Sequence, residues 1–302
     1  MFLCQSIKTE GFKLVLKSRL LLGVFHFLLE HAKKMEQKIR SEKGNSAIIS
    51  LMDQGMMSLI EELYQLRRID FRAVPQHGAP GGDTWEPDEE IPGSHWLSED
   101  CSKNPNKVVR MLFRLSVDYK EVVTVAVEQG LVLPVDIQTG EEWLYGALAK
   151  WSAPTVGAGL IDHSVIRFLT QDFEYAIARK GADFFAIVHG NITPDHALID
   201  KNGIPYLFGM RLVVRPGRYY DFMRGIDWLL LKGMPISDET FDQVVVWLRR
   251  YLKDENWEEI QMIFALRCLG ILWDILYRGE TIDKGRKNLL IPILVRFIER
   301  RY

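Results

Sequence analysis

Residues 186 to 210 read AIVHGNITPDHALIDKNGIPYLFGM, and this stretch decides the fold. It opens with a short apolar run that ends at His189-Gly190 and continues into a polar loop. Two further apolar segments flank Asn202-Gly203, a dipeptide that supplies the positive φ angles of a tight turn. The sequence therefore predicts a β-hairpin in which Ala197 to Ile199 pairs with Ile204 to Phe208.

Helical spacing of apolar residues dominates the chain around this hairpin. The clearest amphipathic helix covers Ser164 to Arg179. Further helices are predicted over Val108 to Val117, Lys120 to Gln129, Glu141 to Trp151, Phe241 to Lys253, Trp257 to Tyr277, and from Lys284 through Pro292. The predicted fold class is α+β and predominantly helical. The apolar character of residues 257 to 277 fits either deep burial or a subunit contact.

The 186 to 210 stretch and the later RPGRYYDFMRGI of residues 215 to 226 resemble the catalytic region of the aminoglycoside phosphotransferase and choline kinase-like family. That family is a branch of the protein-kinase-like fold. Its loop reads H-G-D-x-x-x-x-N, its hairpin ends in I-D-[FW], and a later Y-D-L-A opens a helix. The resemblance implies a kinase-like helical C-terminal lobe over residues 107 to 302.

The three positions that carry the family's chemistry are changed in this sequence. In that family, the loop Asp accepts the proton of the attacking hydroxyl, while the Asn and the hairpin Asp bind magnesium. The corresponding residues here are Asn191, His196 and Gly209. An amide is not a base near neutral pH, imidazole is a poor magnesium ligand, and glycine has no side chain. We therefore expect no catalytic residue and no metal site at these positions.

The positions that shape the loop and the hairpin fit the family pattern instead. They are His189, Gly190, Pro194, Asn202, Gly203 and Asp221. In the family, the Asp matched by Asp221 lies beneath the catalytic loop and accepts hydrogen bonds from its backbone. The resemblance thus implies a retained scaffold and a structural role for Asp221.

The N-terminal part matches the family least. Residues 1 to 70 are predicted as an atypical region with a strand over residues 12 to 19 followed by helices. Lys17 on that strand and Glu30 on the next helix could stand in for the nucleotide-binding Lys–Glu pair of kinases, although a solvated Lys17 is the simpler interpretation. Prolines, glycines and acidic residues fill residues 71 to 106, which are predicted as a linker or long loop.

Composition narrows the possible partners and the cellular location. A formal net charge of -2 provides no field that would attract nucleic acid. The three cysteines form no CxxC pair, so a reducing cytoplasm is expected. No membrane span is predicted, since the apolar run from Leu20 to Leu29 is too short.

The leading functional hypothesis is a catalytically inactive, pseudokinase-like protein that binds or scaffolds a protein partner or a second copy of itself. No cofactor is expected. Two alternatives stay open. Asp195 or Asp200 could supply a relocated catalytic carboxylate, or the protein could bind ATP without magnesium and act as a sensor without phosphoryl transfer.

Overall fold

The structure is a computed structural model that describes residues 46–74, 91, 93–132, 135–209, 212–277 and 282–300. The chain divides into two compact units, residues 1–45 and 46–302, and all the described residues belong to the second unit. The strand predicted over residues 12 to 19, together with Lys17 and Glu30, lies outside the described residues.

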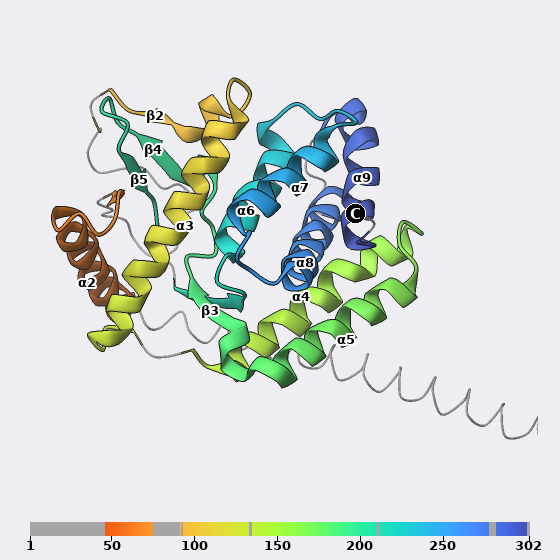
Figure 1. Cartoon of the computed structure of the whole chain (residues 1–302), viewed down its shortest axis with the longest axis horizontal. Helices are drawn as coiled ribbons and strands as arrows, with labels where there is room; N and C mark the ends of the chain where they lie inside the picture. The colour runs from red at the N-terminus through yellow and green to blue at the C-terminus, as the bar shows by residue number, and fades with distance from the viewer. Residues whose placement is uncertain are drawn as a thin grey trace, which may run out of the picture. The chain divides into compact units, whose positions relative to one another are not determined.

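Helices make up most of the second unit, which confirms the predicted fold class (Figure 1). The α-helices are α2 (Ser46–Gln65), α3 (Pro105–Glu128), α4 (Ile137–Gly157), α5 (His163–Lys180), α6 (Tyr220–Trp228), α7 (Thr240–Tyr251), α8 (Trp257–Leu276) and α9 (Lys284–Ile298). The shorter helices are η2 (Leu97–Asp100), η3 (Gly181–Phe184), η4 (Pro194–His196) and the π-helical turn η5 (Leu229–Gly233).

The described residues also form two small sheets. The strands are β1 (Arg72–Ala73), β2 (His95–Trp96), β3 (Phe185–Val188), β4 (Ala197–Ile199), β5 (Pro205–Leu207) and β6 (Val213–Pro216). The first sheet has the order β1-β5-β4-β2, in which only the β1–β5 pair is parallel. The second sheet pairs β3 with β6 in antiparallel fashion. The predicted pairing of Ala197–Ile199 with the following strand is present as β4–β5.

Helix α3 lies between the first sheet and the C-terminal helices in Figure 1. It contacts α2, β3 and α6. The sequence predicted two helices here, yet Pro105 to Glu128 form a single helix that Asn104 caps by accepting a hydrogen bond from Lys107 N. No glycine or proline interrupts the segment between the two predicted helices, so the helix continues through it.

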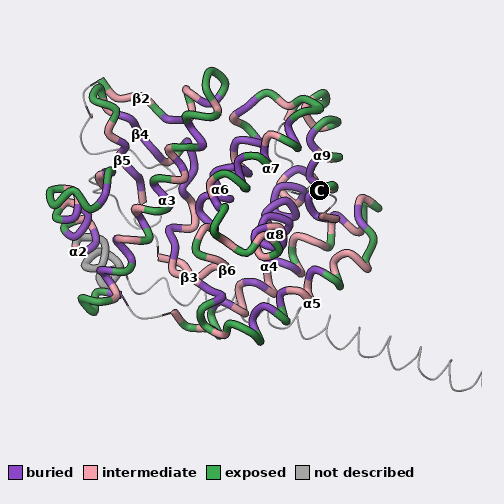
Figure 2. Tube along the Cα trace, viewed as in Figure 1, coloured by how far each residue is buried: buried purple, intermediate pink, exposed green. Residues whose placement is uncertain are grey.

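Helix α8 is largely buried, as Figure 2 shows. Phe264, Leu266 and Leu269 are fully buried, and α8 packs against α4, α9 and α6. The apolar character of residues 257 to 277 therefore reflects burial within this chain, which decides between the two interpretations left open by the sequence.

Residues 71 to 106 were predicted to form a linker or long loop, and the described part of this range contributes a short strand near each end. β1 pairs with β5 and β2 pairs with β4, so both strands are integral to the sheet. A strand of two residues is too short to show a periodic pattern, and here it is completed by partners more than a hundred residues away. Trp96 stacks on Phe208 with ring centroids 5.0 Å apart, which holds β2 against the hairpin.

We expect Trp96→Ala to lower the free energy of unfolding by about 1 kcal/mol, because the stacked aromatic pair is lost although Trp96 itself is 36% exposed. Urea denaturation checks this value. Leu66→Ala is the control, since Leu66 is 60% exposed and should change stability by less than about 0.5 kcal/mol. Equal effects of the two substitutions would show that the 91–100 segment is not held by this stack.

The predicted boundary at residue 70 also differs from the structure. Met56, Ile60 and Leu63 of α2 are buried, and α2 contacts α3 and β1. Ser46 to Asp70 therefore belong to the same unit as the C-terminal helices. Leu66 follows the last residue of α2 and is exposed.

Candidate functional site

The loop from His189 to His196 connects β3 with β4 and is the candidate site. It starts with a sharp change of direction at Gly190, which has φ +81°. A Cβ atom at this position would lie 2.5 Å from Val213 Cγ2 of β6. Glycine is thus required both by the backbone angle and by the close approach of the second sheet.

The carboxylate of Asp221 anchors this loop from the first turn of α6. One oxygen accepts a hydrogen bond from His189 N at 2.8 Å, and the other accepts from Gly190 N at 2.7 Å. Asp221 is only 2% exposed. Burial raises the pKa of its carboxyl to about 6, while the hydrogen bonds from the loop backbone act in the opposite direction. This is the contact that the family resemblance implies for Asp221.

One turn further along α6, Gly225 lets the helix approach the loop. A Cβ atom at Gly225 would lie 3.2 Å from the carbonyl oxygen of Ile192 and 2.8 Å from Leu112 Cδ1. Asp221 and Gly225 are four residues apart and so share one helix face. That face of α6 supports the loop.

The loop is also tied to the end of the hairpin. The imidazole of His189 is 1% exposed, and its Nε2 lies 3.0 Å from the carbonyl oxygen of Phe208. In the other direction, Phe208 N donates to the carbonyl oxygen of His196 at 3.0 Å. These contacts place Gly209, which the resemblance matches to the family's second carboxylate, directly after Phe208, a residue hydrogen-bonded to both ends of the loop.

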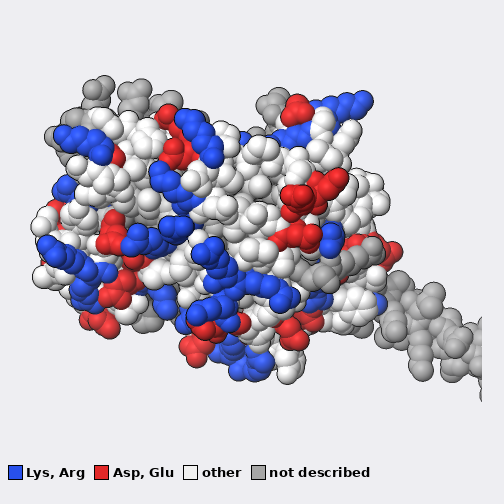
Figure 3. All heavy atoms as spheres, turned by 45° about the horizontal axis from the view of Figure 1, so that its top comes forward, with Lys and Arg blue, Asp and Glu red and all other residues white. Residues whose placement is uncertain are grey.

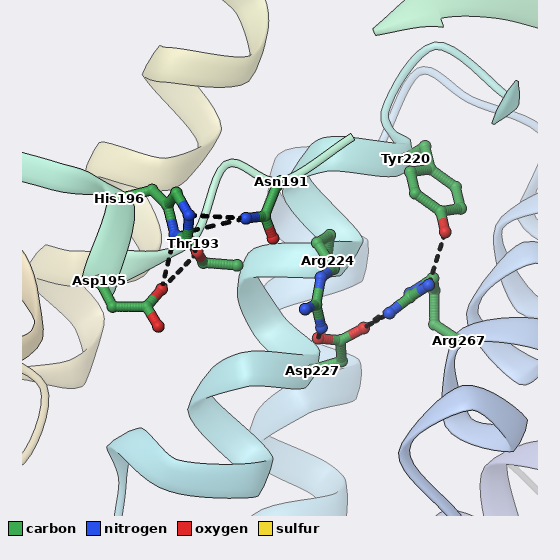
Figure 4. Close-up of polar contacts among 8 residues, drawn as sticks. All are labelled: Asn191, Thr193, Asp195, His196, Tyr220, Arg224, Asp227 and Arg267. Atoms are coloured by element: carbon green, nitrogen blue, oxygen red, sulfur yellow. Dashed lines mark hydrogen bonds and ion pairs between the residues drawn. The ribbon is translucent and has the colours of Figure 1, made fainter. Parts of the chain in front are cut away.

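Asn191 and His196, the other two changed positions, contact each other (Figure 4). Asn191 Nδ2 lies 2.9 Å from His196 Nε2. Thr193 Oγ1 and the Asp195 carboxylate both lie near the other ring nitrogen, Nδ1, at 3.0 and 3.1 Å. The Asn191 amide therefore lies against one ring nitrogen of His196, while Thr193 and Asp195 lie against the other.

Asp195 accepts hydrogen bonds from side chains of its own loop and also interacts with the Trp228 side chain of α6. Thr193 Oγ1 donates to Asp195 Oδ1 at 2.5 Å, in addition to the contact with His196. Burial acts to raise the pKa of the Asp195 carboxyl, but the hydrogen bonds from His196 and Thr193 outweigh it and hold the pKa well below its ordinary value. Asp195 therefore carries its charge at neutral pH and shares it with neighbouring loop side chains.

This lowered pKa predicts a pH dependence of stability. A carboxyl with a lower pKa in the folded state stabilises the fold above its unfolded pKa, near 3.8, and that stabilisation is lost as the pH falls toward the folded value. We expect Asp195→Asn to be less stable than the unchanged protein at pH 7, with the difference shrinking between pH 4 and pH 2. Urea midpoints across this range measure it. A difference that grows in acid would contradict the assignment.

Asp200 shapes the hairpin turn. Its Oδ1 accepts hydrogen bonds from Asn202 N and Ile204 N, both at 2.8 Å. Gly203 has φ +82°, whereas among the described residues the only non-glycine positions with positive φ are Arg67 and Arg300. The predicted two-residue turn with positive φ at both Asn202 and Gly203 is therefore wrong. Asp200 stabilises a wider turn that needs left-handed backbone only at the glycine.

Two predicted site residues remain, Pro194 and Gly209. Pro194 is buried at the start of η4. Gly209 has φ +66°, and a Cβ atom there would have no heavy atom within 4 Å. Within the described part of the chain, no three His, Cys, Asp or Glu side chains converge so as to hold a metal ion.

A buried ion pair next to the site was not identified from the sequence. Asp227, at the end of α6, is fully buried and accepts a hydrogen bond from Arg267 Nε of α8 at 2.6 Å. Arg267 also donates to the Tyr220 hydroxyl, and Arg224 Nη1 donates to Asp227 at 2.7 Å (Figure 4). Burial disfavours the charged guanidinium, but Asp227 holds the pKa of Arg267 above its ordinary value. The sequence signal was an arginine inside an otherwise apolar helix.

Charged side chains outside the site are mixed in sign. Figure 3 shows basic and acidic side chains interspersed over the face that it displays. Arg114 pairs with Asp70 and Arg68 pairs with Glu121. No described helix combines the length and apolar character needed to cross a bilayer.

Comparison with known proteins gives one similar structure. No family model matches the sequence, and no curated protein matches it. Among solved structures, the chain is similar to the crystal structure of choline kinase LicA from Streptococcus pneumoniae, with a TM-score of 0.44 and 13% sequence identity. The similarity covers 83% of this chain and 80% of that chain.

Proposed function

We propose that this protein is a catalytically inactive, pseudokinase-like protein that acts as a binding or scaffolding module. One observation carries the proposal: the Asn191 amide is hydrogen-bonded to the imidazole of His196. The residues that replace the family's base and metal ligand are thus bonded to each other. Neither residue supplies the carboxylate that proton abstraction requires, or the hard oxygen that a magnesium site prefers.

The supporting structure around these residues favours a retained scaffold. The Asp221 carboxylate, the bend at Gly190 and the contact between His189 and Phe208 fix the loop without any help from the changed positions. A loop held this firmly keeps its shape when its chemical groups are replaced. The family resemblance accounts for the shape, and the substitutions account for the proposed loss of transfer.

The alternative of a relocated carboxylate receives less support. Asp195 bonds to Thr193 and His196 in its own loop, and Asp200 bonds to the backbone of its own turn. Both carboxylates have local structural partners. This favours a catalytically inactive protein over an enzyme in which Asp195 or Asp200 has taken over catalysis.

The proposal includes a protein partner or self-association, and a cytoplasmic location. Cys101 and Cys268 are buried free thiols, as expected in a reducing compartment. Burial raises the pKa of the Cys101 thiol to about 12, so this residue is not a reactive thiolate.

Incubation of the purified protein with labelled ATP, magnesium and a panel of small hydroxyl and amino compounds tests the proposal. We expect no phosphate transfer above that of an Asn191→Ala variant. Transfer that disappears in Asn191→Ala, or equally in Asp195→Asn, would overturn the proposal. The second result would identify Asp195 as the relocated carboxylate.

A thermal-shift measurement with ATP separates a scaffold from a sensor. A ligand that binds only the folded state raises the apparent melting temperature. For a scaffold without a cofactor, we expect no shift with or without magnesium. A shift with ATP alone that magnesium does not enlarge would replace the scaffold proposal with a nucleotide sensor.

A further inference from the structure

A hollow of about 160 Å³ opens between α3, β3 and the residues just before α6. Its inner wall includes Tyr119, Val123 and Val188, all of which are buried. Its mouth includes Lys120 and Arg218, which are exposed. An apolar cavity of about 150 Å³ is large enough to hold a benzene ring. The hollow therefore combines room for one ring with two cations at its entrance.

The two cations at the mouth differ in how far their charge is neutralised. Arg218 forms an ion pair with Glu255. The Lys120 ammonium forms no ion pair with any described residue. The mouth thus carries an unneutralised positive charge, which favours an anionic group at the entrance rather than in the interior.

Asp221 also lines the hollow and is buried. Both of its oxygens accept hydrogen bonds from the loop backbone, at His189 and Gly190. A ligand's carboxylate would be repelled here by the buried carboxyl, so the apolar part of the ligand must face inward. A ligand in this hollow would pack directly behind the residue that anchors the candidate site.

We propose that this hollow binds a small aromatic carboxylate, with its ring between α3 and β3 and its carboxylate against Lys120. Binding fills the space beside Asp221 and stabilises the 189–196 loop. This site lies outside the changed positions of the loop, and the proposal is independent of whether the loop transfers phosphate.

Titration of the isotope-labelled full chain with benzoate at pH 7.5, followed by amide NMR, tests the proposal. We expect saturable shifts centred on the amides of Val188, His189 and Gly190. Benzamide, which has the same shape without the charge, should bind about threefold more weakly, because an ion pair with an exposed lysine contributes less than a buried one. Lys120→Met should weaken benzoate binding by a similar factor.

Lys103→Met is the matched control, since it removes an exposed lysine that precedes α3 and does not line the hollow. Thr124 is exposed and lines the hollow, so Thr124→Trp should block the mouth and abolish benzoate binding. The amide signals away from the hollow should stay unchanged. If Thr124→Trp does not fold, Val123→Phe replaces it as the test, because the larger side chain fills the interior of the hollow. Absence of saturable shifts, or undiminished binding by the blocked or filled variant, would overturn the site. Equal binding of benzamide would overturn the role of Lys120.

Discussion

Asp227→Ala is expected to lower the free energy of unfolding by about 3 to 5 kcal/mol, the largest effect that we predict for a single side chain. The substitution leaves the guanidinium of Arg267 buried, at 5% residue exposure, without its carboxylate. It also removes the partner of Arg224. A buried charge without a partner costs far more than the loss of an exposed ion pair.

Urea denaturation of matched variants measures this effect. Asp242→Ala is the control, because it removes an exposed aspartate from α7 and should change stability by less than about 0.5 kcal/mol. The double variant Asp227→Leu with Arg267→Met removes both charges and should recover most of the loss. A double variant as unstable as Asp227→Ala would show that packing, rather than the unpaired charge, sets the cost.

Gly190→Ala is expected to cost about 2 to 4 kcal/mol, from two sources. The residue adopts φ +81°, which strains any side chain other than glycine. The added Cβ would also overlap Val213 Cγ2, at 2.5 Å. Since β6 and the loop cannot both keep their positions, the overlap adds to the backbone strain.

Gly203→Ala separates these two sources. Gly203 has nearly the same angle, φ +82°, but a Cβ atom there would meet nothing within 4 Å. It should cost only about 1 kcal/mol, the strain alone. Val213→Ala should partly rescue Gly190→Ala and leave Gly203→Ala unaffected. Equal costs at the two glycines, measured by urea denaturation, would show that contact with Val213 is unimportant.

The local elements of the candidate site could be predicted because their signals are local. The hairpin of β4 and β5 and, outside the site, the helix over residues 163–180 each depend on residues close together in the sequence. Asp221 was found through its place in a resemblance that covers the loop, the hairpin and the start of α6. The turn at Asn202-Gly203 was mispredicted, because the Asp200 side chain favours a wider turn that the dipeptide alone does not indicate.

The sequence by itself determined a helix-rich chain with one hairpin, and its resemblance to a kinase-like family singled out Asn191, His196 and Gly209. Only the tertiary structure decided that Asn191 bonds to His196, that Asp227 pairs with Arg267, and that residues on both sides of the 75–90 segment complete the sheet. The physical reason is separation along the chain. Helical periodicity and turn chemistry act over a few residues, whereas strand pairing and buried charge pairing depend on where the folded chain brings distant residues together.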